Sequence, residues 1–127
     1  MTLLRGFSDG QGTAAHFHSP MNLAVNRQGD VYVADFLNHR IRKITSHGEV
    51  TTIAGSGAAL FADGPAMAAG FYQPYGIAVD SEGNLFVSEP EAHRIRKITP
   101  GRGVTENSQA HSSALNVLLL IRAPYEH

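Results

Sequence analysis

The chain of 127 residues contains no cysteine, which excludes disulfide bonds, thiolate metal sites and thiol catalysis together. An excess of either charge is also absent, because 10 basic and 11 acidic side chains leave a formal net charge of -1. No bulk charge therefore draws the chain to nucleic acid or acidic lipid. The longest apolar run, Val117–Ile121, is far shorter than the roughly 20 residues of a membrane-spanning helix. The N-terminal stretch has one basic residue and no apolar run, so we expect no signal peptide, no membrane contact and a soluble protein.

What the sequence contains instead is an internal duplication with a constant shift of 54 residues. The segment His39–Thr45, HRIRKIT, returns letter for letter as His93–Thr99. A fixed period of about 50 residues indicates a repeat architecture. The same shift, without a gap, relates further pairs of residues: Asp9 and Asp63, Phe17 and Phe71, Pro20 and Pro74, and Val33 and Val87.

Each repeat contains four short segments of β-forming residues separated by turn residues. The second segment is an unbroken apolar run, as in Val31–Val33, which is typical of a strand that is covered on both faces. The expected strands, in chain order, are Asn22–Val25, Asp30–Ala34, Arg40–Thr45, Glu49–Ala54, Gly76–Val79, Leu85–Ser88, Arg94–Thr99 and one that begins at Val104.

This repeated meander predicts an all-β fold of two four-stranded antiparallel β-propeller blades, with Asn22–Val25 and Gly76–Val79 as the innermost strands. A β-sandwich of two meanders is the alternative. Its outer faces would be polar and alternating, whereas the second strands do not alternate. Asp9–Ser19 has no period, so we expect a loop there, with one helical turn at Ala14–Phe17.

Three segments of the chain resemble the NHL repeat. They are Pro74–Asp80 (PYGIAVD), Gly83–Val87 (GNLFV) and Asn38–Ile44 (NHRIRKI), in which Asn38 and His39 stand at the Asn-His position that gives the repeat its name. The resemblance extends over about residues 1 to 105. It implies that each repeat is one blade of a propeller, usually one of six.

We divide the chain into four parts. Residues 1–8 resemble the outer strand of a preceding blade, 9–55 form the first NHL repeat, 56–105 form a second repeat with an incomplete outer strand, and 106–127 are a divergent tail. Propellers close with typically four to eight blades. We therefore expect either a piece of a longer propeller protein or self-association through the open blade faces.

The charged residues of the third strands are the first candidates for a binding site. A ladder of arginines on neighbouring blades suits RNA phosphates, although arginine stems more often cover apolar strand edges. The turn before this strand differs between the repeats, because Glu89 and Ala92 stand in place of Asp35 and Asn38. The candidate binding residues are Arg40, Arg42, Arg94, Arg96, Asp35, Asn38 and Glu89.

No catalytic or metal-binding pattern is present in the sequence. The resemblance to the NHL repeat extends to peptide-amidating lyases, whose zinc-binding histidines stand between the Pro and Gly of the first-strand motif. Here Met21 and Tyr75 take those positions, so we expect no zinc site. His39 and His93, at one repeat position, are expected to make structural hydrogen bonds. We expect no cofactor.

The sequence thus predicts a non-catalytic propeller module that acts as a protein-interaction platform. Two alternatives stay open: a fragment of an enzyme-like propeller of the lyase or lactonase type, and an RNA-binding NHL propeller. We expect partners to be proteins or further propeller blades, bound through loops at one rim of the blades. Those loops are Asp35–Asn38, Glu89–Ala92, Arg27–Gln28 and Ser81–Glu82.

Overall fold

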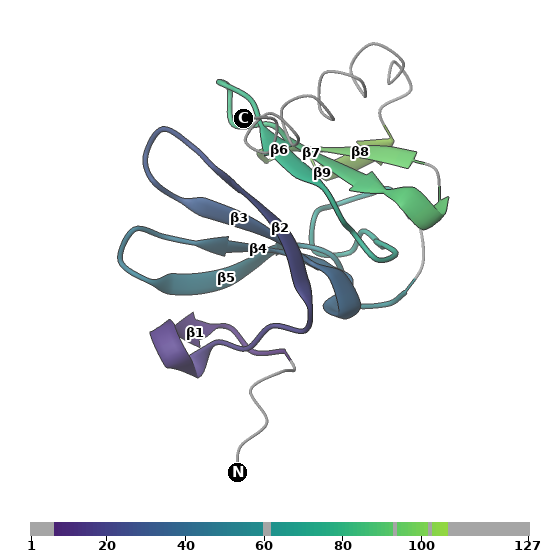
Figure 1. Ribbon diagram of the computed structural model, residues 1–127. Helices are drawn as coiled ribbons and strands as arrows, with labels where there is room; N and C mark the ends of the chain where they lie inside the picture. The colour runs from purple at the N-terminus through teal and green to yellow at the C-terminus, as the bar shows by residue number, and fades with distance from the viewer. Residues whose placement is uncertain (1–6, 60–61, 93, 102, 107–127) are drawn as a thin grey trace, which may run out of the picture.

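The computed structural model describes residues 7–59, 62–92, 94–101 and 103–106, which form two antiparallel β-sheets (Figure 1). The first sheet, called blade 1 below, has the strand order β1-β5-β4-β3-β2. Its strands are β1 (Gly10–Gln11), β2 (Pro20–Val25), β3 (Val31–Asp35), β4 (Arg40–Ile44) and β5 (Glu49–Ala54). The predicted tail, 106–127, lies almost wholly outside the described residues.

The second sheet, blade 2, has the order β6-β7-β8-β9. Its strands are β6 (Ile77–Val79), β7 (Leu85–Glu89), β8 (Arg94–Thr99) and β9 (Gly103–Glu106). The described helical residues form single 3₁₀ turns, η1 (Gly12–Ala14), η2 (Phe36–Asn38) and η3 (Pro90–Ala92), and none of the described helices could span a bilayer. The two predicted propeller blades are therefore confirmed.

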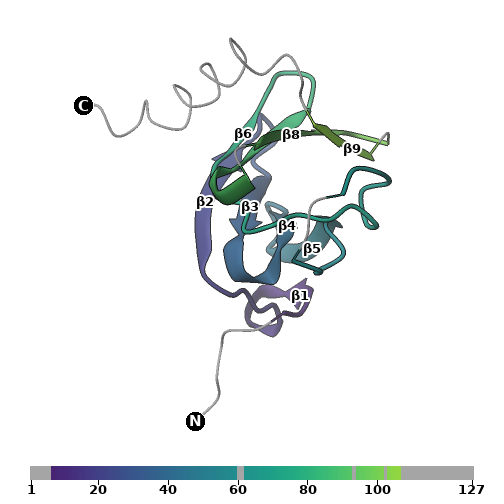
Figure 2. The same ribbon diagram turned by 90° about the vertical axis from the view of Figure 1, so that its right-hand side faces the viewer.

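The strands β2 and β6 lie side by side, while β1 and β9 lie at the far edges of the two sheets (Figure 2). Asn22 in β2 donates a hydrogen bond from Nδ2 to the backbone oxygen of Tyr75, just before β6, at 3.1 Å. This arrangement agrees with the expected innermost position of the two short strands.

Blade 1 differs from the prediction by one short strand, because part of the expected loop Asp9–Ser19 pairs with the sheet. Gly10 lies opposite Val50, and Gln11 opposite Glu49. An outer strand without a neighbour leaves a row of N–H and C=O groups unpaired, and the returning loop satisfies some of them. The expected helical turn lies earlier, at η1. In blade 2, Gly64 bridges Val104 at the same repeat positions as Gly10 and Val50.

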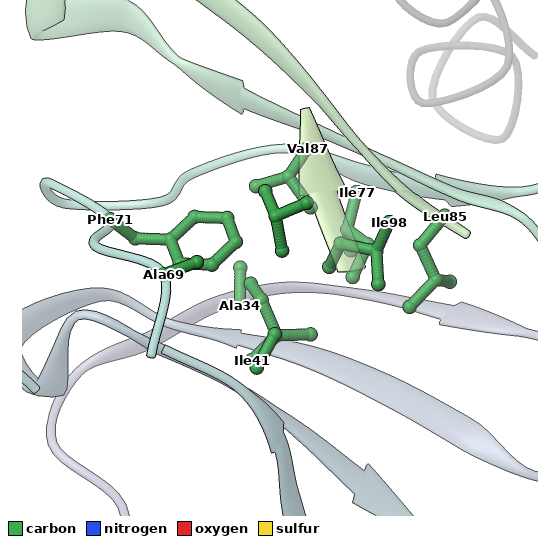
Figure 3. Close-up of a cluster of buried hydrophobic side chains, with 10 residues drawn as sticks. Ala34, Ile41, Ala69, Phe71, Ile77, Leu85, Val87 and Ile98 are labelled. Atoms are coloured by element: carbon green, nitrogen blue, oxygen red, sulfur yellow. The ribbon is translucent and has the colours of Figure 1, made fainter. Parts of the chain in front are cut away.

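The hydrophobic core lies between the two blades. Ala34 and Ile41 of blade 1 point toward Val87 and Ile77 of blade 2, and Phe71 from the loop between the blades closes one side (Figure 3). Alternation along β3 and β4 places these two side chains of blade 1 on one face. We call this face, which blade 2 covers, the covered face of blade 1; its members are Ala24, Tyr32, Ala34, Ile41 and Ala54.

The opposite face of blade 1 carries the same apolar pattern that blade 2 buries in the core. We call it the free face. The strand register groups its members Leu23, Val25, Val31, Val33, Ile44 and Val50, and the shift of 54 maps them onto Ile77, Val79, Leu85, Val87, Ile98 and Val104. Leu23 is 61% exposed, whereas its counterpart Ile77 is 2% exposed. Leu23 thus differs in burial from its counterpart because only one of the two faces has a neighbouring blade among the described residues, whereas Val33 and Val50, at 6% and 4%, are buried in blade 1 as well.

This inequality predicts different costs for equivalent truncations. We expect Ile77→Ala to lower the free energy of unfolding by about 2–5 kcal/mol, because it leaves a cavity in the core. The matched variant Leu23→Ala, in dilute solution, should change it by about 0.5 kcal/mol or less. Urea unfolding followed by circular dichroism measures both, and similar costs for the two variants would contradict the packing described here.

Candidate functional site

The candidate charged residues gather inside the blades. Arg42 in β4 is fully buried, and its guanidinium lies 2.8 Å from Asp35 Oδ2 and 3.0 Å from Asp9 Oδ1. It also donates to two backbone oxygens of the returning loop, those of Ser8 at 2.7 Å and His16 at 2.8 Å. One side chain therefore holds the loop against the sheet. We call this group an arginine clamp.

Blade 2 repeats the clamp at positions shifted by 54 residues. Arg96 in β8 is fully buried and lies 3.1 Å from both Glu89 Oε1 and Asp63 Oδ1. It donates to the backbone oxygens of Gly70 and Ala62, each at 2.8 Å. Both arginines are thus used to attach the loop before each blade to the blade itself.

The second oxygen of each buried carboxylate also has a donor. Asp35 Oδ1 accepts from the backbone N–H of His18 at 2.8 Å, and Glu89 Oε2 accepts from that of Tyr72 at 2.7 Å. In the first repeat, Asn38 donates from Nδ2 to Asp35 Oδ2 at 2.7 Å. Burial raises the pKa of Glu89 above its ordinary value, against the opposing effect of the Tyr72 N–H and of Arg96.

An aromatic ring completes each clamp. The guanidinium carbon of Arg42 lies 4.6 Å from the ring centroid of Phe17, and that of Arg96 lies 4.8 Å from that of Phe71. A guanidinium over an aromatic face is attracted by the ring quadrupole. The clamp therefore also places Phe71 in the core between the blades.

The structure brings five of the seven predicted site residues together in these clamps, and it shows no exposed arginine ladder among the described residues. The five are Asp35, Asn38, Arg42, Glu89 and Arg96. Arg40 is half-buried, donates to the backbone oxygen of Ser56 at 3.2 Å and lies 3.7 Å from the ring centroid of Phe7. Arg94 is also half-buried and pairs with Glu89 in the strand register.

Two members of the clamps, Asp9 and Asp63, are not among the candidate binding residues that the sequence predicts. Each lies opposite a buried arginine 33 residues further along the chain. The signal was present in the sequence, because the Asp-Gly pair and the arginine recur with the same shift. What it lacked was any indication that the two are in contact.

His39 links blade 1 to the segment that leads into blade 2. Its backbone is left-handed, with φ of 56°. Its Nδ1 accepts a hydrogen bond from the backbone N–H of Gln73 at 3.1 Å, and its ring stacks on that of Tyr72 at a centroid distance of 5.7 Å. Burial and the charge of Arg40 lower the pKa of His39. Neutral His39 is the form that accepts this hydrogen bond, as expected for a structural histidine.

The four predicted binding loops lie at two rims, and not at one rim as the sequence predicts. In an antiparallel meander, consecutive turns lie at opposite ends of the strands. The first rim carries η2, η3 and the starts of β2 and β6, and we call it the η rim. Its exposed apolar side chains are Met21, Leu37 and Tyr75, with exposed fractions of 44%, 38% and 42%.

The second rim consists of turns held by side-chain oxygens. Asn26 Oδ1 accepts from the backbone N–H groups of Gln28 and Asp30, each at 2.9 Å. Asp80 Oδ1 accepts from those of Glu82 and Asn84, also at 2.9 Å. Although burial opposes it, hydrogen bonds to Asn84 and Glu82 lower the pKa of Asp80. These bonds hold the turns in one shape and leave residues 27–28 and 81–82 exposed.

The described residues contain no group of three His, Cys, Asp or Glu side chains that could hold a metal ion. Ser8 Oγ lies 3.0 Å from His16 Nδ1, but it donates its proton to the backbone oxygen of Ala14 at 2.9 Å. This pair therefore serves the shape of the loop.

Comparison with known proteins finds the NHL repeat family at residues 17–44. The chain is 33% identical over 99 residues to Protein SUPPRESSOR OF QUENCHING 1, chloroplastic, from Arabidopsis thaliana, which covers 77% of this chain and 9% of that protein. The chain thus spans less than a tenth of the length of this curated relative.

Two solved structures from Bacteroides thetaiotaomicron are similar in fold and sequence. A protein of unknown function shares 32% identity with a TM-score of 0.70, over 80% of this chain and 25% of the other. An auxiliary nutrient binding protein shares 30% identity with a TM-score of 0.67, over 82% and 26%. The chain therefore corresponds to about a quarter of each of these structures.

Removing a clamp arginine should destabilise the fold. We expect Arg96→Met to lower the free energy of unfolding by roughly 3–5 kcal/mol, because it leaves the buried Glu89 carboxylate without its cation. The double variant Arg96→Met/Glu89→Leu should recover much of this loss, since both charges are then replaced by apolar groups. Urea unfolding measures both, and a double variant no more stable than the single would contradict the pairing.

The lowered pKa of His39 predicts a loss of stability in acid. Between this pKa and the ordinary value of 6.5, the unfolded chain binds more protons than the folded chain, so stability falls as the pH decreases through that interval. His39→Asn tolerates the left-handed backbone and does not titrate. Its unfolding midpoint should therefore change less than the parent's between about pH 7.5 and about pH 5.5. Parallel profiles would contradict this account.

Proposed function

This chain belongs to the NHL-repeat family of β-propellers, and on that premise we propose that it is a non-catalytic module that binds a protein partner at the η rim. The proposal rests on which side chains remain exposed to a partner, because the others are bound within the fold. The most strongly charged candidates, the two clamp arginines and their buried carboxylates, are bound to one another and to the loops. Their geometry supports a structural role.

The observation that carries the proposal is the equal exposure of Met21 and Tyr75. They occupy one repeat position, and they are 44% and 42% exposed although only the blade of Tyr75 is packed against a preceding blade. Packing between blades therefore does not cover this position. An apolar side chain that stays exposed both with and without a preceding blade is available to a partner.

The chemistry and rigidity of the η rim suit a protein interface. Aromatic residues and methionine are enriched at such interfaces, and large side chains on a fixed scaffold bind at a low cost in conformational entropy. The backbone at this rim is held by the hydrogen bond from Asn22 to Tyr75 and by that from Leu37 N–H to the oxygen of His18 at 3.0 Å. A structural relative whose name refers to nutrient binding also supports a binding role.

The two alternatives have less support. RNA binding through an arginine ladder would need Arg42 and Arg96 at the surface, and both are fully buried. A reaction of the lyase or lactonase type would need a reactive group, and the described residues offer no metal-binding group of side chains. Neither alternative is favoured by an observation of its own.

The test is a binding experiment with matched rim variants. The immobilised chain is used to isolate a partner, which is identified by mass spectrometry, purified and titrated by calorimetry. We expect Leu37→Asp and Tyr75→Asp each to weaken binding at least about tenfold, because a charge replaces an apolar contact. Gln28→Asp, at an exposed position on the opposite rim, should bind as the parent does.

A partner whose affinity is the same for the parent and for both rim variants would refute the proposal. Filter binding of mixed-sequence RNA at low salt serves as the second measurement. Tight, salt-dependent RNA binding that is lost in the double variant Arg40→Gln/Arg94→Gln would indicate that the chain binds RNA and not a protein partner.

A further inference from the structure

One hydrogen bond joins the two halves of the η rim. The N–H of Gln73, in the segment that leads into blade 2, donates at 3.1 Å to Nδ1 of His39, which follows η2 of blade 1. Leu37 lies two residues before His39, and Tyr75 lies two residues after Gln73. The exposed side chains of the two blades are therefore connected through this imidazole.

Both residues of this hydrogen bond have a left-handed backbone, with φ of 56° for His39 and 49° for Gln73. Residues other than glycine adopt this conformation at a cost, so the surrounding contacts must hold it. For Gln73 these contacts include the bond to the imidazole, on which the ring of the preceding residue, Tyr72, stacks at a centroid distance of 5.7 Å. The course of the segment before Tyr75 therefore depends on His39.

Only the neutral imidazole can accept this hydrogen bond. A protonated histidine carries N–H groups on both ring nitrogens, so Nδ1 of His39 would face the N–H of Gln73 as a second donor. Burial and the charge of Arg40 lower the pKa of His39 below 6.5. The bond is therefore intact at neutral pH and is lost in acid.

The other titratable groups beside this contact are in hydrogen bonds or ion pairs of their own. Glu89 Oε2 accepts from a backbone N–H of the same segment at 2.7 Å, and Asp35, before η2, is paired with its clamp arginine at 2.8 Å. The backbone oxygen of His18 accepts from the N–H of Leu37 at 3.0 Å, which places a second imidazole near the rim. Burial raises the pKa of Glu89, so a test in acid must separate its titration from that of His39.

We propose that His39 is a pH-dependent switch at the η rim: its neutral form holds the two halves of the rim in the geometry that binds a protein partner, and its protonation weakens that binding. The proposal rests on partner binding at the η rim and adds a means of regulating it. Tyr75 keeps the backbone hydrogen bonds that it donates to Ser88 at 2.9 Å and accepts from Asn22 at 3.1 Å. Protonation therefore distorts the rim and leaves the blades intact.

The switch itself is measured without a partner. In the isotope-labelled chain, NMR follows the amide shift of Gln73 and the ring shifts of His39 between about pH 7.5 and about pH 5. We expect both to change with one midpoint below 6.5. In His39→Asn, which tolerates the left-handed backbone, the Gln73 amide should no longer titrate. His47→Asn removes an exposed imidazole from the turn between β4 and β5 and should leave the titration unchanged.

The effect on binding is measured with a protein that the immobilised chain captures and that Tyr75→Asp binds at least about tenfold more weakly. Because one hydrogen bond is lost, calorimetry should show the affinity of the parent falling about fivefold between about pH 7.5 and about pH 5. His39→Asn should bind at both pH values about as weakly as the parent does in acid. His47→Asn should behave as the parent does.

Three results would overturn the proposal. The first is a parent in which Gln73 and His39 titrate with different midpoints, which needs no variant. The second is a titration of the Gln73 amide that persists in His39→Asn, since it would then belong to Glu89 or His18. The third is an affinity with the same pH dependence in the parent and in His39→Asn.

These results are distinct from a failure of the proposed binding site. That site is refuted if Tyr75→Asp binds the captured proteins as the parent does, whatever the pH. The NMR titration of the Gln73 amide does not use a partner, so it reports on the switch in either case.

Discussion

The burial of one guanidinium in each blade is the constraint on which the rest of the structure depends. A charge of this kind is costly in the interior unless paired and hydrogen-bonded. Arg42 and Arg96 meet this requirement only if the loop before each blade returns to supply an aspartate and two backbone oxygens. The position of the loop, and with it that of Phe71 in the core, follows from satisfying that charge.

Because of the duplication, equivalent residues of the two blades can differ in how far they are exposed to solvent. Each blade presents one apolar face backed by a clamp and one face of small and β-branched residues, and within the chain these two types of face meet once. On the opposite face of blade 1, Leu23 and Val25 stay exposed. Leu23 and Ile77 occupy one repeat position and differ in exposure from 61% to 2%, so the difference comes from the neighbour and not from the residue.

The residues that are informative about function are therefore not the repeated charged ones but the exposed apolar ones. Repeated arginines stand out in a sequence because charge suggests ligands, yet here both clamp arginines are interior parts of the fold. The side chains open to a partner are apolar, at Met21, Leu37 and Tyr75 on the η rim and at Leu23 and Val25 on the free face. Affinity at protein interfaces comes chiefly from a few large side chains of this kind.

The sequence by itself determined the strands and the repeat, because both depend on local patterns. Glu49–Ala54 and Arg94–Thr99 were predicted with their observed bounds, since β-branched runs between turn residues favour extended backbone wherever they lie. Only the tertiary structure decided the pairing of Asp9 with Arg42, the extra strand β1 and the separation of the loops into two rims. Each depends on contacts between residues far apart in the chain, and a side chain's exposure is set by whatever packs against it.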